Sequence, residues 1–253
     1  MIESSILTLL LLAFLGSVAG LVGSVIYFVH IPFSRRFCGL AVPFAAGVLL
    51  TVSFLDLLPE AVELVGERAF IVALIAFLAA FLFEEFFAGL HHHEHRGHTM
   101  TKTAVPLVLA GDTIHNFIDG VAIASAFVVD PSFGLVVSFA TFLHETPHEI
   151  GDFGILINAG WSRSRALLAN LFSASATFPG ALMVYFFATE SPSLEGTFLA
   201  ISAGLFLYLG ATDFLPSIHD NYAGQGTKIK VLVLLLGVAI MSAVIFGVPH
   251  GHM

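Results

Sequence analysis

The feature that most constrains this chain is a series of long apolar runs separated by short polar connections. A membrane-spanning helix needs about 20 consecutive, mostly apolar residues. The stretches that fit this description lie at about 5–29, 40–58, 69–90, 104–128, 133–158, 164–188, 196–215 and 228–248. The pattern predicts an all-α membrane protein with eight transmembrane helices, and residues 1–253 are expected to form a single transmembrane domain.

Composition supports a chain whose surface faces the lipid bilayer. Only 11% of the residues are charged, whereas a soluble domain carries about 25%. The net charge of −9 argues against nucleic acid as a partner. Cys38 is the single cysteine, which excludes a disulfide framework and a cysteine-based zinc site. The first residues lack the basic segment of a cleaved signal peptide, so the first run is expected to be retained.

The basic residues predict the orientation of the spans. Of the nine, only Arg68 follows an even-numbered run. The others lie in the connections after the first, third, fifth and seventh runs: Arg35, Arg36, Arg96, Lys102, Arg163, Arg165, Lys228 and Lys230. Because basic connections stay on the cytoplasmic side, both termini are expected to be extracytoplasmic.

A weak internal repeat links the second and seventh runs. The second ends Asp56-Leu57-Leu58-Pro59, and the seventh ends with the similar segment 213–216, which begins at Asp213. With eight spans, these two segments cross the membrane in opposite directions. That relation is typical of transporters built from inverted repeats.

The fourth and fifth runs carry the chemistry. Polar and ionisable residues cluster near their centres, at 111–120 and 142–152. Ionisable side chains are expensive in lipid and usually mark a functional site. The short connection near 130–133 makes the two helices antiparallel neighbours. The side chains on their facing surfaces are therefore expected to meet.

Helical spacing sorts these side chains into faces. His115 and Asp119 are four residues apart, as are His144 and His148, so each pair shares a face. We expect three imidazoles and a carboxylate at one depth, a ligand set suited to tetrahedral zinc. Glu145 and Glu149 form a second pair on the fifth run.

A neighbouring group of oxygen ligands is expected beside these imidazoles. Asn116, Asp119 and Glu145 could hold a second ion or support the ligands of the first. A lone membrane histidine often does no more than hydrogen-bond to a neighbouring helix. Several buried acids, however, need a cation or a proton to offset their charge, which favours the metal interpretation.

Other acidic residues outline a possible route for a cation. Asp56 is expected toward the outer end of the second run and Asp213 toward the inner end of the seventh. The remaining acids are expected on the inner half of their runs: Glu84, Glu85, Glu149 and Asp152. Each alone could be an ordinary interfacial charge. The connection at about 91–103 is rich in histidine, a composition that binds transition metals, and is expected to be cytoplasmic.

One motif supports an alternative function. Residues 144–148 match H-E-x-x-H, in which two histidines hold zinc and the glutamate is the general base of a protease. An intramembrane zinc protease is therefore the alternative reading. Pro147 inside the motif and Glu149 directly after it count against that reading, as do the candidate partner ligands His115 and Asp119, which precede the motif.

The paired motifs resemble those of a known family. H-N-F-I-D-G at 115–120 and H-E-T-P-H-E at 144–149 are similar to the signature of the ZIP metal transporters, in the branch with H-E-x-P-H-E. The resemblance covers most of the chain, including the expected eight spans and the His-rich connection. It implies a transporter rather than an enzyme, which imports Zn²⁺ or a related divalent ion toward the cytoplasm. It also implies a homodimer, and we expect the plasma (inner) membrane as the location.

The resemblance implies a binuclear centre. One ion would take His115, Asp119, His144 and His148. The second would take Asn116, Asp119 and Glu145, with His148 as a further candidate. The sixth run contributes no acid to that second position, and Asp56 stands where this branch often has histidine.

The sequence does not rank Zn²⁺ against Fe²⁺, Mn²⁺, Co²⁺ or Cd²⁺. Histidine ligands favour zinc over manganese, but geometry and availability decide selectivity. The chain has no P-loop nucleotide motif, so transport is expected to follow the electrochemical gradient.

Overall fold

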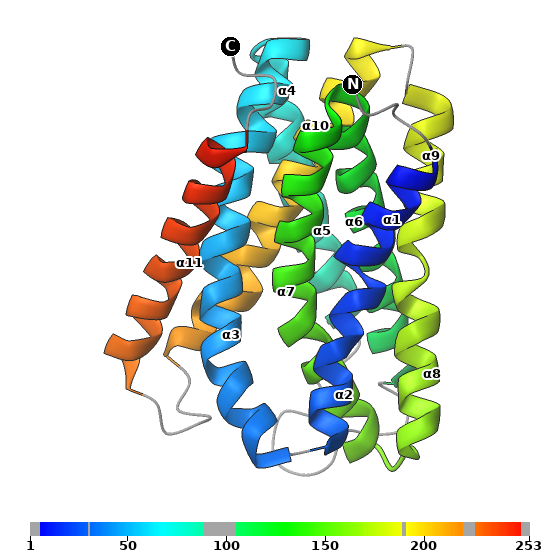
Figure 1. The fold of residues 1–253 in the computed structure, drawn as a ribbon, viewed down its shortest axis with the longest axis vertical. Helices are drawn as coiled ribbons and strands as arrows, with labels where there is room; N and C mark the ends of the chain where they lie inside the picture. The colour runs from blue at the N-terminus through cyan, green and yellow to red at the C-terminus, as the bar shows by residue number, and fades with distance from the viewer. Residues whose placement is uncertain (1–5, 30, 89–104, 189–190, 220–225, 249–253) are drawn as a thin grey trace.

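The protein is described by a computed structural model that covers residues 6–29, 31–88, 105–188, 191–219 and 226–248. These residues form a bundle of helices that run roughly along one long axis (Figure 1), and they contain no strand. The α-helices are α1 Ile6–Gly16, α2 Val22–Val29, α3 Ile31–Val52, α4 Leu58–Val65, α5 Arg68–Ala88, α6 Val105–Val129, α7 Pro131–Asn158, α8 Arg163–Ala174, α9 Thr177–Ala188, α10 Pro192–Tyr208 and α11 Thr227–Gly247. The all-helical prediction is confirmed.

Short 3-10 and π-helical segments lie between several of these α-helices. Two are 3-10 turns, η1 Val18–Leu21 and η4 Leu215–Ile218, and two are π-helical, η2 Ser53–Leu57 and η3 Leu209–Phe214. Asp56 lies in η2 and Asp213 in η3. The two segments of the predicted repeat therefore share an unusual local backbone.

Several helical stretches of the bundle are long and apolar enough to cross a membrane. Among the described residues, five helical stretches are long and apolar enough to cross a membrane: Ile6–Val25, Phe37–Val65, Arg163–Phe187, Pro192–Phe214 and Thr227–Gly247. The helices α5, α6 and α7 lie outside this set and carry several acidic residues. Eight spans and extracytoplasmic termini stay predictions. The His-rich connection at 91–103 lies outside the described residues.

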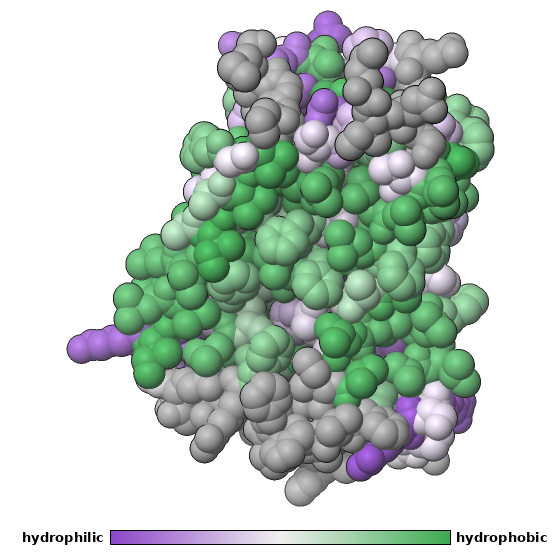
Figure 2. Space-filling model, viewed as in Figure 1, coloured by the Kyte–Doolittle hydropathy of each residue, from purple (hydrophilic) through white to green (hydrophobic). Residues whose placement is uncertain are grey.

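The surface agrees with a bilayer environment. On the face shown in Figure 2, apolar residues cover the middle of the molecule, and hydrophilic residues lie nearer its two ends. Among the described residues, large apolar side chains such as Leu74, Phe172 and Leu232 are more than half exposed. A water-soluble monomer rarely exposes so much contiguous apolar area.

The helices that carry the polar residues are close neighbours inside the bundle. Asp130 alone links α6 to α7, and its carboxylate caps α7 by accepting hydrogen bonds from the backbone N–H groups of Ser132 (2.7 Å) and Phe133 (3.2 Å). Pro131 at the first helical position suits this start. The predicted packing of α6 against α7 is confirmed.

Close backbone contacts fix α6 against α9. A Cβ atom added at Gly120 would lie 2.0 Å from the carbonyl oxygen of Thr177, and one added at Gly180 would lie 2.0 Å from that of Phe117. Only glycine fits at such distances. An added Cβ at Gly111 or Gly151 would meet nothing within 4 Å. The sequence alone does not distinguish glycines at close helix contacts, such as Gly120, from glycines beside open space, such as Gly111.

Candidate metal centre

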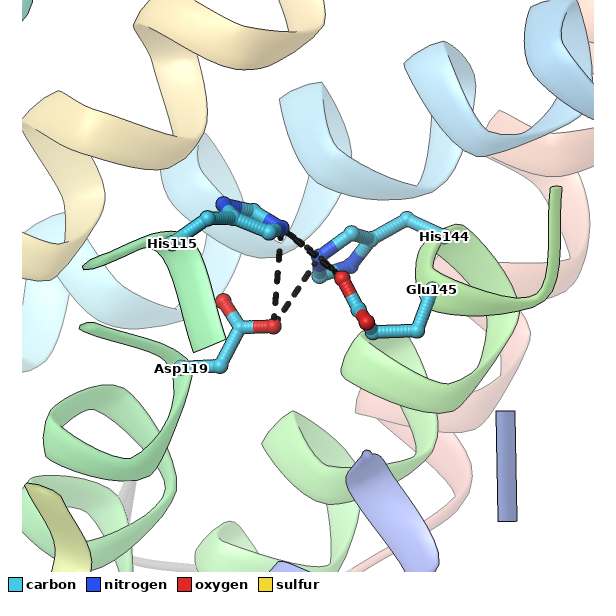
Figure 3. Close-up of side chains that lie close together, drawn as sticks. All are labelled: His115, Asp119, His144 and Glu145. Atoms are coloured by element: carbon cyan, nitrogen blue, oxygen red, sulfur yellow. Dashed lines mark hydrogen bonds and ion pairs between the residues drawn. The ribbon is translucent and has the colours of Figure 1, made fainter. Parts of the chain in front are cut away.

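Four side chains from α6 and α7 converge inside the bundle. His115 and Asp119 lie one turn apart on α6, and His144 and Glu145 are adjacent on α7. Each offers a ligand atom, and these atoms all lie within 4.8 Å of one another. Figure 3 shows the side chains pointing toward a common centre. We refer to His115, Asp119, His144 and Glu145 as the four-residue cluster.

The spacing of these atoms matches a small coordination shell. His144 Nε2 lies 3.3 Å from both His115 Nε2 and Asp119 Oδ2, and His115 Nε2 lies 2.8 Å from Glu145 Oε1. The remaining two nitrogen-to-oxygen separations, His115–Asp119 and His144–Glu145, are each 3.7 Å. Ligands at about 2.0–2.1 Å from tetrahedral zinc are separated by roughly 3.3–3.4 Å. The cluster therefore has dimensions suited to zinc.

One of the imidazoles is held in the form that binds metal. Nδ1 of His144 lies 3.1 Å from the carbonyl oxygen of Ala140. A carbonyl can only accept, so the proton of the neutral ring is on Nδ1 and the lone pair is on Nε2, which faces the cluster. A backbone acceptor that fixes the tautomer is typical of metal-binding histidines.

Several carboxylate oxygens of this cluster have no hydrogen-bond partner among the described residues. Asp119 and Glu145 are fully buried. Within the described part of the chain, both carboxylate oxygens of Asp119 and Oε2 of Glu145 have no hydrogen-bond partner. An unsatisfied buried polar group costs about 1–3 kcal/mol, and more when charged. A bound cation would satisfy these oxygens.

His148 also lies near two aspartates outside the four-residue cluster. Its Nδ1 is 3.7 Å from Asp112 Oδ1 and 3.6 Å from Asp152 Oδ2. Asp112, His148 and Asp152 form a second group with metal-ligand spacing, which we call the three-residue cluster. The ring of His148 lies 5.0 Å from that of His115 between centroids, compared with 5.4 Å between the rings of His115 and His144. The expected set of three imidazoles therefore stays a prediction.

Asn116 is fully buried and takes part in a hydrogen-bond network. Its Nδ2 donates to the backbone oxygen (3.1 Å) and to Oδ1 (3.0 Å) of Asp112. Its Oδ1 accepts from the hydroxyls of Ser17 (2.6 Å) and Thr177 (3.3 Å). The side chain is thus held in place by α6, α9 and the residue that follows α1.

The other predicted site residues lie outside both clusters. Glu149 Oε2 accepts from Asn170 Nδ2 at 2.5 Å and from the Ser24 hydroxyl at 3.3 Å. Asp56 is fully buried in η2. Asp213 in η3 is exposed, and its Oδ1 accepts from the Thr212 hydroxyl at 3.3 Å. Neither of the two groups with metal-ligand spacing includes any of these three acids.

Aromatic rings cover the histidines on one side. The ring of Phe206, on α10, lies 5.5 Å from that of His144 in an edge-to-face arrangement. Phe214, in η3, lies 6.5 Å from His144 and 6.4 Å from His148. Both phenylalanines are buried. They reduce the access of water to the imidazoles.

Sequence reasoning missed several residues of this region. Asp112 and Asp152 were not among the expected ligands, although Asp152 lies four residues after His148 and continues its stripe. Ser17 and Ser24 support the site through hydrogen bonds to α6 and α7. Nothing in the apolar first run indicated that these two serines would form such hydrogen bonds.

Comparison with known proteins gives independent evidence on the family of this chain. A family model described as ZIP Zinc transporter matches residues 91–245. Zinc transporter foi of Drosophila melanogaster is 38% identical over 136 residues, which are 53% of this chain and 19% of that protein. Zinc transporter ZIP4 of Homo sapiens is 45% identical over 112 residues, 44% of this chain and 17% of that protein. Zinc transporter ZIP10 of Mus musculus is 36% identical over 161 residues, 58% of this chain and 19% of that protein. The matched part thus spans less than a fifth of each of these relatives.

Proposed function

Because the chain belongs to the ZIP zinc transporter family, we propose that it moves Zn²⁺ across a membrane and that the four-residue cluster binds the ion in transit. Proteins of this family are transporters and not enzymes, and the chain is a multi-pass integral membrane protein. The single observation that carries the proposed site is the set of ligand separations, 2.8–3.7 Å, around unsatisfied buried carboxylates.

The chemistry of the cluster suits a transported ion. Two imidazoles and two carboxylates can replace the water shell of Zn²⁺, and the negative charge offsets that of the ion. The ligands come from two helices, so relative movement of α6 and α7 would weaken the site and permit release. Binding must be strong enough to admit the ion and weak enough to let it leave.

The protease alternative is set aside. H-E-x-x-H chemistry requires both histidines of the motif to hold one ion. Here His148 Nδ1 is grouped with Asp112 and Asp152, whereas His144 is grouped with His115, Asp119 and Glu145.

Import toward the cytoplasm is our proposal for direction. It rests on the family resemblance and on the predicted orientation. In that orientation the connections after the even-numbered runs, which include Glu60, Glu63 and Asp130, lie outside and would concentrate cations there. A homodimer and the plasma membrane as location rest on the resemblance alone. Fe²⁺, Mn²⁺, Co²⁺ and Cd²⁺ remain further candidate substrates, and competition against Zn²⁺ uptake would rank them.

The test is zinc uptake into proteoliposomes that contain a zinc-sensitive dye. Wild type should admit zinc faster than protein-free liposomes, and Asp119→Asn should lose most of that uptake because it removes a buried anionic ligand. Asp130→Asn is the matched control, since it removes one carboxylate outside the cluster and asparagine is an equally good helix cap. Uptake no faster than in protein-free liposomes would refute transport, and normal uptake by Asp119→Asn would refute the site.

A further inference from the structure

The three-residue cluster is not used by the site described so far. We propose that Asp112, His148 and Asp152 form a second zinc position, onto which the ion passes from the four-residue cluster. The inference rests on the proposed function. The second ligand set that the family resemblance implies stays a separate prediction, and the Asn116 side chain is hydrogen-bonded to Ser17, Thr177 and Asp112.

Burial and unsatisfied atoms support a ligand at this position. Asp112 and Asp152 are 3% and 8% exposed. Among the residues that the structure describes, Oδ2 of each aspartate and Nδ1 of His148 are buried without a hydrogen-bond partner. Asp152 Oδ2 and His148 Nδ1 are nevertheless only 3.6 Å apart. A cation bound between these side chains would satisfy the unpartnered aspartate oxygens and the His148 nitrogen.

The ligand set suits a site from which an ion can leave. Sites with three protein ligands keep an open coordination position, which water or another ligand fills. His148 is the most accessible member, with 24% of its side chain exposed. The second position is therefore expected to bind zinc less tightly than the four-residue cluster, whose most accessible side chain, His115, is 15% exposed, as release requires.

The two clusters are spaced for a stepwise transfer. From the four-residue to the three-residue cluster, the ligands move five to six residues along both α6 and α7, or about 8 Å at 1.5 Å per residue. The ring of His148 borders both groups, since it lies 5.0 Å from the ring of His115. In the predicted orientation this step leads toward the cytoplasm. Two divalent cations at that distance repel each other, so arrival of one favours departure of the other.

Asn116 helps to hold this second position in place. Its amide donates to Asp112 Oδ1 at 3.0 Å, which leaves Oδ2 for a metal. The same side chain is anchored by the Ser17 hydroxyl at 2.6 Å. We therefore assign Asn116 as a positioning residue for Asp112.

The test is a count of bound zinc on the purified full-length chain. The protein is dialysed to equilibrium against buffered Zn²⁺, and zinc per chain is measured by mass spectrometry. Asp130→Asn should bind as many ions as wild type, and the double variant Asp112→Asn/Asp152→Asn should bind one fewer. Diffraction from wild-type crystals soaked in Cd²⁺, with anomalous signal between Asp112 and Asp152, tests the same position without a variant.

The outcomes separate this inference from the proposed function. A double variant that binds as much zinc as wild type, or wild-type crystals with no cadmium between the two aspartates, would overturn the second position. Neither measurement depends on transport, so one ion fewer in the double variant than in wild type supports the position even if proteoliposomes admit no zinc. That last result would refute only the proposed function.

Discussion

Replacing His144 by alanine tests the four-residue cluster most directly. His144 is fully buried, and its Nε2 lies 3.3 Å from both His115 Nε2 and Asp119 Oδ2. A four-ligand zinc site releases roughly 10–16 kcal/mol on binding, so one ligand contributes about 3 kcal/mol. We therefore expect His144→Ala to weaken zinc binding about 100-fold.

The assay is a competition titration of purified protein against a zinc-binding dye. His219→Ala is the matched control, because it removes an exposed imidazole outside both clusters. His144→Ala also leaves a cavity, which could lower stability on its own. His144→Gln keeps most of the volume, and a melting curve for each variant would show whether the fold persists. A well-folded His144→Ala variant whose zinc affinity stays within about threefold of wild type would refute the proposed ligation.

Three further predictions concern packing, buried polar groups and pH. Gly120→Ala should destabilise the protein by about 1–3 kcal/mol in a thermal melt, because its Cβ would lie 2.0 Å from the Thr177 carbonyl oxygen, whereas Gly111→Ala should have little effect. Asn170→Leu should destabilise the protein by about 1–3 kcal/mol, because it removes the 2.5 Å hydrogen bond to buried Glu149; an unchanged melting temperature would contradict this. Zinc uptake should fall as the pH is lowered from about 7.5 to about 5.5, since imidazole must be unprotonated to bind metal, and a flat profile would count against histidine ligands.

The fold class and the helix pair could be predicted because both depend on local patterns. Apolar runs longer than about 18 residues have few interpretations other than membrane helices. The polar stretches at 111–120 and 142–152 fall on two helices joined by Asp130, so their packing follows from the short connection. Residues His115, Asp119, His144 and Glu145 were all expected near the centre, and the structure brings them together.

Features that depend on tertiary packing could not be read from the sequence. Ser17 reaches Asn116 across 99 positions of the chain, and Ser24 reaches Glu149 across 125. A serine in an apolar run is usually an ordinary interhelical contact. The π-helical backbone at Asp56 and Asp213 was likewise not predictable, although the matching tetrapeptides marked both places. Such π-helical segments occur frequently at functional sites.

The proximity of His148 to Asp112 follows from helix geometry. A step of four residues keeps a side chain on the same face but moves it about 6 Å along the axis. In an antiparallel pair, moving forward along α7 is matched by moving backward along α6. His144 therefore faces His115 and Asp119, whereas His148, one turn further, faces the preceding turn of α6 and meets Asp112. The stripe His144–His148–Asp152, which runs beside the antiparallel helix α6, therefore contributes to two groups of possible ligands.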